Sequence, residues 1–206
     1  LMQQKYTAQI ELQQSRIDQQ AATIDSGRHI SMLNMMNIVL ANVNEELGKT
    51  TARKLSDETI EQIAALSYSF NSHVYLESDG IPHDKRSPER GQLLLLLTTM
   101  HIDSGSLHKI MTKTSFAGAL LREADLEGTN LAGVDLQGAD LQDANLQGAN
   151  LDSANLSFAN LWGANLHQAH LNETNLKRAD LRWSILNEAD LEKSDLKEAD
   201  LTSAQL

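Results

Sequence analysis

The sequence contains no cysteine, so it can form neither a disulfide bond nor a thiolate metal site. It has only two prolines and 4% aromatic residues, which points to a core of Leu and Ala side chains. No apolar run approaches the roughly 18 residues of a membrane-spanning helix, since the longest, Leu93–Leu97, is far shorter. There is no signal-peptide pattern either. We therefore expect no membrane span in this chain and a cytoplasmic location, with membrane association only through an anchor upstream of Leu1.

What the chain does contain is a repeat of five residues over 114–206. The third position of every unit is Leu, except in the first unit, where it is Phe116. The first position is small, the second is usually Asp or Asn, and the last two are mostly polar. Eighteen complete units are followed by three residues, so the pattern runs without a slip to Leu206.

A period of five matches neither a helix nor a flat strand. A chain that turns after each unit instead closes a square coil of roughly 20 residues, and coils stacked about 4.8 Å apart bury their leucines along one axis. The A-[DN]-L-x-x run resembles the pentapeptide-repeat proteins, which form a right-handed quadrilateral β-helix. The resemblance covers 93 of the 206 residues, and it implies an all-β solenoid of about 4.6 coils.

The N-terminal half is expected to be mainly α-helical, in two parts, 1–48 and 49–113. Within the first 25 residues, Ile10, Ile17 and Ile24 lie seven apart. This spacing fits either a short parallel coiled coil, which would make a self-associating stalk, or a single surface helix.

A second helical pattern follows, with apolar residues at helical spacing from Ile30 to Leu47. Its apolar face is wide, so we expect the helix to be largely buried, and Gly48 suits its C′ cap. The methionines on this face are interpreted as core, with an adaptable docking surface as the alternative.

Residues 49–113 carry several helix-start signals. Ser56 precedes two acidic residues, and Ser87 precedes Pro88, so both serines are predicted N-caps. We expect a polar loop over 78–87 and a last short helix capped by Ser106.

The segment 87–113 stands directly before the first repeat. A solenoid end exposes apolar core and unpaired backbone, so we expect this segment to form its N-terminal cap. The sequence S-P-E-R-G-Q-L-L-L-L-L is also similar to the juncture in bacterial membrane-tethered pentapeptide-repeat proteins, which implies a bacterial origin.

The net charge is −11, and it is unevenly distributed. The repeats hold 15 acidic and six basic residues, a net charge of −9. Such a surface disfavours direct nucleic-acid binding and favours cationic partners. The alternative is that Asp at the second position only serves turns and solubility.

The candidate binding site lies where the repeat departs from its pattern. With 20 residues per coil, Trp162 and Trp183 fall on one wall in adjacent coils, and Phe158 and Ile185 lie around its corners. All four occupy outward positions, so they predict one exposed apolar patch that binds a protein. The basic residues that border this patch are Lys177, Arg178 and Arg182. The alternative is that single surface aromatics have no binding role.

No catalytic constellation is found, because the sequence has neither a Gly-rich phosphate loop nor a nucleophile elbow. His167 and His170 lie near Glu173, but three or four converging ligands are needed for a typical zinc site, so we interpret them as surface histidines. We expect no catalytic residues, no cofactor and no metal, and hence no enzyme.

Two functions are carried forward. The first is a non-catalytic protein-interaction scaffold, which forms a homo-oligomer through residues 1–25 or through the coil edge after Leu206. The alternative is DNA mimicry, because the family includes fluoroquinolone-resistance proteins that bind DNA gyrase. The Leu-centred, uninterrupted repeats and their many neutral Asn and Gln residues argue against it. A gyrase supercoiling assay separates the two.

Overall fold

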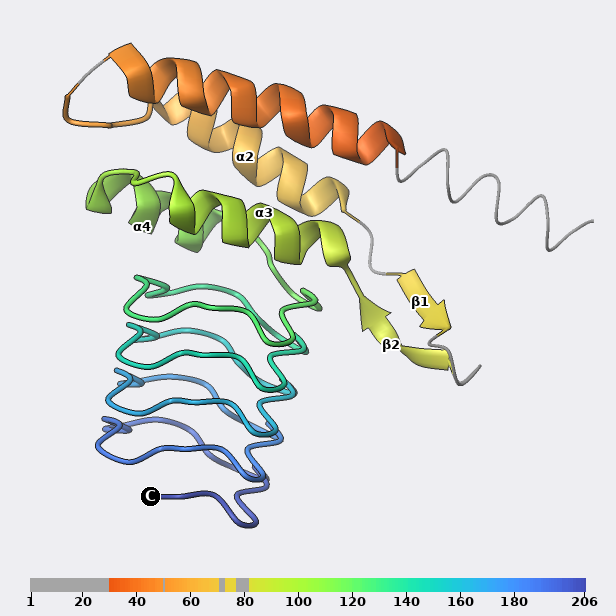
Figure 1. Cartoon of the computed structure of the whole chain (residues 1–206), viewed down its shortest axis with the longest axis vertical. Coiled ribbons are helices and arrows are strands. Elements are labelled where there is room, and N and C mark those ends of the chain that lie inside the picture. The colour runs from red at the N-terminus through yellow and green to blue at the C-terminus, as the bar shows by residue number, and fades with distance from the viewer. Residues whose placement is uncertain (1–29, 50, 71–72, 77–81) are drawn as a thin grey trace, which may run out of the picture. The chain divides into compact units, whose positions relative to one another are not determined.

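The computed structural model describes residues 30–49, 51–70, 73–76 and 82–206 (Figure 1). The chain divides into two units, Leu1–Ile38 and Val39–Leu206, and each is considered by itself. The coiled coil expected over the first 25 residues lies outside the described residues.

The first described helix runs over residues 30–49. In the second unit it buries Leu40, Val43 and Leu47 at helical spacing. In the first unit, Met35 and Ile38 are exposed. Burial is therefore confined to one stripe, which is narrower than the sequence predicts.

Gly48 lies inside this helix, and its φ is outside the left-handed region. The predicted C′ cap at Gly48 is therefore wrong, because such a cap requires a left-handed residue after the last helical turn.

α2 (Asp57–Ser69) begins at the predicted N-cap. The Ser56 hydroxyl accepts a hydrogen bond from the Thr59 amide at 3.2 Å, which satisfies one of the free N–H groups of the first turn. The helix buries Ile60, Ile63 and Ala64 on one face, as their spacing predicts.

β1 (His73–Leu76) and β2 (Pro82–Arg86) form an antiparallel pair. The predicted polar loop over 78–87 is therefore wrong for 82–86. The segment Pro-His-Asp-Lys-Arg has no apolar alternation to signal a strand, and it becomes one because β1 offers its backbone a partner.

α3 (Pro88–Thr99) begins with Pro at its first position, and the Ser87 hydroxyl accepts a hydrogen bond from Arg90 N at 3.2 Å. The predicted cap at Ser87 is thus confirmed. Five consecutive leucines predict burial on most sides, but Leu95 and Leu96 are only partly buried. No helix in the described part of the chain is both long enough and apolar enough to cross a membrane.

α4 (Ser104–Lys113) starts two residues earlier than its predicted cap at Ser106. The Asp103 carboxylate accepts hydrogen bonds from Gly105 N at 3.1 Å and Ser106 N at 3.2 Å, so Asp103 is the N-cap. The Ser106 hydroxyl is instead used across the fold, where it accepts a hydrogen bond from Leu55 N at 3.1 Å.

From residue 114 the chain winds into stacked coils that lie beneath α3 and α4 in Figure 1. Fifteen parallel β-bridges join residues 20 apart, from Ser115↔Asp135 to Ile185↔Gln205. The 20-residue coil predicted from the pentads is what these bridges show. Each wall contributes one bridged residue per coil, rather than an extended strand, because the turns take up two of every five residues.

The inward positions fill the axis of the coils. The third-position leucines from Leu121 to Leu186 and most first-position alanines are buried. In the last coil Leu191, Leu196 and Leu201 are only partly buried, and Leu206 is 77% exposed. Self-association through this edge stays a prediction.

Every fifth position of the repeat has a left-handed backbone, with φ between 56° and 74°. The residue forms a tight turn in which the next amide returns to the preceding Leu carbonyl, as in Ala124 N to Leu121 O at 3.2 Å. Twelve of the 18 positions are not Gly, so the coils hold many side chains in a conformation that L-residues disfavour.

Gly148→Ala and Gly48→Ala should change stability in opposite directions. A Cβ meets no atom within 4 Å at either site, but Gly148 has φ +63° and Gly48 is helical. We expect Gly148→Ala to cost about 1 kcal/mol and Gly48→Ala to add up to about 1 kcal/mol. Urea unfolding followed by circular dichroism measures both, and the same sign for the two variants would contradict this account of the turn.

The helical part is joined to the first coil by backbone pairing. Ser87 N donates to Gly118 O at 2.7 Å, and Leu120 N donates to Ser87 O at 3.2 Å. Arg90 adds a side-chain link, since its Nη1 donates to Ala117 O at 2.6 Å. At Gly91, a Cβ would lie only 2.2 Å from Leu120 O, so α3 approaches the coil as closely as glycine permits.

One carboxylate in the repeats is fully buried, although the sequence predicts only Leu, Ala and similar residues there. The Asp140 side chain has no exposed surface, and it pairs with Arg86 Nη1 at 2.6 Å and Arg122 Nε at 2.5 Å. It also accepts a hydrogen bond from Asn160 Nδ2 at 2.8 Å. Arg86 ends β2, so this cluster connects the hairpin to the first two coils.

Candidate functional site

The predicted site residues lie on two adjacent walls of the solenoid, each defined by one bridge ladder. The tryptophan wall is the wall whose bridged residues are Leu120, Asp140, Asn160, Asp180 and Asp200. The Phe158 wall is the wall whose bridged residues are Ser115, Asp135, Asn155, Asn175 and Asp195.

The tryptophan wall presents Trp162 and Trp183 in adjacent coils, with 36% and 60% of their surface exposed. Phe158 is 53% exposed at the corner where the Phe158 wall turns into this wall. Ile185 departs from the prediction, because it is only partly exposed in the bridge ladder between Asn165 and Gln205. The apolar surface therefore consists of three aromatic side chains rather than four residues.

Phe158 and Trp183 both occupy left-handed turn positions, with φ of 61° and 62°. Bulky residues are outliers in this region of the backbone, which Gly fills elsewhere in the same repeat, as at Gly163. The turn itself therefore does not account for an aromatic side chain at either position. Backbone strain of this kind is a reason to look for a function.

The three basic residues that border the predicted patch are all paired with carboxylates. Arg182 contacts Asp180 through Nε at 2.8 Å and Nη2 at 2.6 Å. The side-chain hydrogen bond from Arg182 holds the pKa of Asp180 below its usual value, so both groups are charged at neutral pH. On the neighbouring wall, Lys177 pairs with Asp195 at 2.9 Å and Arg178 pairs with Glu198 at 2.6 Å.

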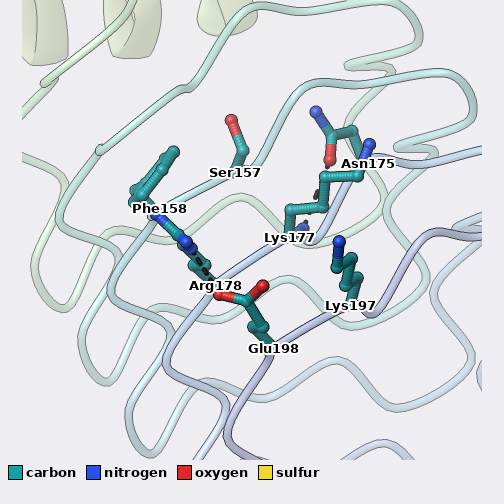
Figure 2. Close-up of a pocket in the computed structure, with 7 residues that line it drawn as sticks. All are labelled: Ser157, Phe158, Asn175, Lys177, Arg178, Lys197 and Glu198. Carbon is teal, nitrogen blue, oxygen red and sulfur yellow. Dashed lines mark hydrogen bonds and ion pairs between the residues drawn. The ribbon is translucent and has the colours of Figure 1, made fainter.

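A depression of about 300 Å³ opens on the Phe158 wall (Figure 2). Its lining residues come from three successive coils and are Ser157, Phe158, Asn175, Lys177, Arg178, Lys197 and Glu198. The Arg178 guanidinium lies 5.5 Å from the centroid of the Phe158 ring, within the range of a cation–π contact. Trp162, Trp183, Ile185 and Arg182 do not line this depression.

The sequence thus predicts three of the seven lining residues, namely Phe158, Lys177 and Arg178. The prediction starts from aromatic departures and misses Lys197 and Glu198, although a 20-residue offset places them directly beneath Lys177 and Arg178. Stacking every outward charge by that offset is the signal that finds them.

His167 and His170 were weighed as metal ligands in the sequence. The structure places His167 Nδ1 at 2.8 Å from Asn187 O, whereas His170 is exposed in the bridge ladder between Asn150 and Asp190. No group of three His, Cys, Asp or Glu residues in the described chain is arranged to hold a metal ion.

The geometry of the coils can now be compared with known proteins. The family pattern described as pentapeptide repeats matches residues 110–148, 149–187 and 174–206, with eight copies. Residues 110–206 belong to the pentapeptide-repeat family. A comparison with curated protein sequences finds no match.

Solved structures of other pentapeptide-repeat proteins are similar to this domain. One from the thylakoid lumen of Arabidopsis thaliana is 29% identical, with a TM-score of 0.45, over 47% of this chain and 67% of that one. Rfr23 from the cyanobacterium Cyanothece 51142 is 34% identical, with a TM-score of 0.33, over 45% and 60%. QnrB1, a plasmid-mediated fluoroquinolone resistance protein, is 19% identical, with a TM-score of 0.22, over 45% and 55%.

Proposed function

We propose that this protein is a non-catalytic interaction module, in which the pentapeptide-repeat domain presents a rigid wall to a protein partner. The observation that carries the proposal is the exposure of Phe158, Trp162 and Trp183 on adjacent faces of otherwise polar coils. Large exposed aromatic side chains in neighbouring positions are typical of binding surfaces. Their backbone positions support this reading, because the turns favour Gly where Phe158 and Trp183 stand.

The charge around the tryptophans indicates which surface the partner should offer. The outward positions of the tryptophan wall hold two arginines against five acidic residues, which are Glu123, Asp140, Asp143, Asp180 and Asp200. The pairing of Arg182 with Asp180 leaves no unpaired cation beside Trp183. We therefore propose a partner whose apolar contact area is rimmed by basic residues. A cytoplasmic location is part of this proposal.

Replacing both tryptophans should remove the partner without unfolding the domain. We expect Trp162→Ala/Trp183→Ala to weaken binding at least about tenfold, because aromatic anchors commonly contribute 2 kcal/mol or more to an interface. The measurement is affinity capture from a lysate of the source organism, with quantitative mass spectrometry of wild type and variant.

The matched control is Gln142→Ala/Thr202→Ala, which alters the same pentad position on the same wall in the flanking coils. This control should retain the partner. If the two variants and the wild type recover identical sets of proteins, the tryptophan wall is not the docking surface.

DNA mimicry is a second candidate, supported only by the sign of the charge on most of the repeat surface. The likeness to QnrB1 indicates a shared fold and carries no argument about gyrase. The tryptophan wall does not resemble a continuous row of phosphates, because apolar rings interrupt its carboxylates. Inhibition of gyrase supercoiling at micromolar protein would favour this candidate over the first.

A further inference from the structure

The Phe158 wall differs in charge from the other three walls of the solenoid. Its outward positions hold three bases, Lys177, Arg178 and Lys197, which are half of all bases in the repeats. They are balanced by three acids, Asp135, Asp195 and Glu198, so this wall is neutral. The other three walls share the remaining 12 acids and three bases, a net charge of −9.

The three bases are concentrated at one place on that wall. Lys177 and Lys197 occupy the same pentad position in neighbouring coils, so their backbones lie about 4.8 Å apart along the axis. Asp195 pairs with Lys177 at 2.9 Å, whereas no ion pair of Lys197 is found among the described residues. The depression that both lysines line therefore offers an ammonium group without a carboxylate partner.

The aromatic ring of the depression is partly occupied and partly open. The Arg178 guanidinium lies 5.5 Å from the ring centroid of Phe158, and Glu198 fixes the guanidinium at 2.6 Å. The ring is nevertheless 53% exposed. Figure 2 shows Phe158 and Arg178 along one side of the depression and the two lysines along the other. The site thus combines an apolar contact with positive charge a short distance away.

We propose that this depression binds a short acidic peptide segment of a partner protein. A Glu or Asp carboxylate pairs with the ammonium of Lys197, and an adjacent apolar or aromatic side chain packs on Phe158. The site lies on a different wall from Trp162 and Trp183, so it stands independently of the function proposed above.

Charge and size favour a peptide over a nucleic acid. A volume of about 300 Å³ accommodates one or two side chains. A polyanion that extends beyond the depression meets the walls of net charge −9, whose repulsion acts over roughly 8 Å at physiological ionic strength. A peptide with one or two carboxylates places its charge only where the lysines are.

Isothermal titration calorimetry of the full chain tests the proposal with the peptide Ser-Glu-Phe-Glu-Ser, blocked at both ends, at about 50 mM salt. We expect binding in the micromolar to millimolar range, and at least about tenfold weaker binding of the same peptide with Gln in place of both Glu. The variant Lys177→Ala/Lys197→Ala should lose the Glu peptide to the same extent. Lys193→Ala, an exposed lysine paired with Glu192 elsewhere on the solenoid, should bind as wild type does.

Three outcomes would overturn the proposal. They are equal binding of the Gln and Glu peptides, unchanged binding by the double lysine variant, and no heat at 1 mM peptide, an upper limit about equal to weak specific binding. A four-nucleotide single-stranded DNA that binds more tightly than the Glu peptide would also overturn it, since the site would then recognise phosphate. Loss of the partner in the tryptophan variant leaves these results unaffected, so the two proposals fail separately.

Discussion

Asp140→Asn should lower the free energy of unfolding by about 3 kcal/mol, because it leaves a buried charge without its partner. The Asp140 side chain is completely buried between Arg86 and Arg122, at 2.6 Å and 2.5 Å. Asparagine keeps the size of the side chain but not its charge. The guanidinium of Arg86, whose side chain is only 16% exposed, would then lose its carboxylate partner in a site that water hardly reaches.

The repeat supplies a matched control for this change. Asp180 stands at the same pentad position of the same wall, and it likewise accepts a hydrogen bond from the backbone amide two residues on. Its partner Arg182 is 47% exposed, so Asp180→Asn should cost less than about 1 kcal/mol. Urea unfolding of both variants, followed by circular dichroism, gives the comparison. Equal losses would show that the burial of Asp140 has no energetic consequence.

The same residue shows how far the sequence predicts this fold. The 20-residue coil is predictable because one residue type at one spacing can be buried in only one way. The role of Asp140 is not, since a dozen other units carry Asp or Asn at the second position. What distinguishes it is Arg86, which arrives from β2, and the sequence gives no alternating pattern by which to predict that strand. Contacts between the repeat and the helical part are therefore what pattern alone does not provide.

The candidate site divides in a similar way. The exposure of Trp162 and Trp183 follows from their outward pentad positions, and the structure agrees. The neutralisation of Arg182 by Asp180 depends on side-chain geometry within one unit, so the pattern cannot give it. The depression beside Phe158 depends on residues of three coils, and it is found only when the 20-residue stacking is applied to charges as well as to aromatic residues.

The contact between α3 and the first coil leads to the second large effect. Gly91→Ala should destabilise the protein by about 1–3 kcal/mol, because the new methyl group overpacks a tight contact with backbone. A Cβ at Gly91 would lie 2.2 Å from Leu120 O and 3.0 Å from Leu120 C. Neither atom can move aside alone, because Leu120 N donates to Ser87 O and Leu120 pairs with Asp140 in the bridge ladder.

Hydrogen exchange shows where this destabilisation acts. In Gly91→Ala the amides of Leu120 and Ser87 should exchange faster than in wild type, since both form the backbone pairing that joins α3 to the coil. The amides of central coils such as Leu151, which donates to His170 O at 2.8 Å, should keep their protection, because each coil is held mainly by its neighbours. Gln92→Ala changes the adjacent, exposed position of α3 and should alter stability by no more than about 0.5 kcal/mol. Uniformly faster exchange through all coils would instead mean that the helical part and the solenoid unfold as one unit, and that the contact at Gly91 stabilises the whole domain rather than its first coil.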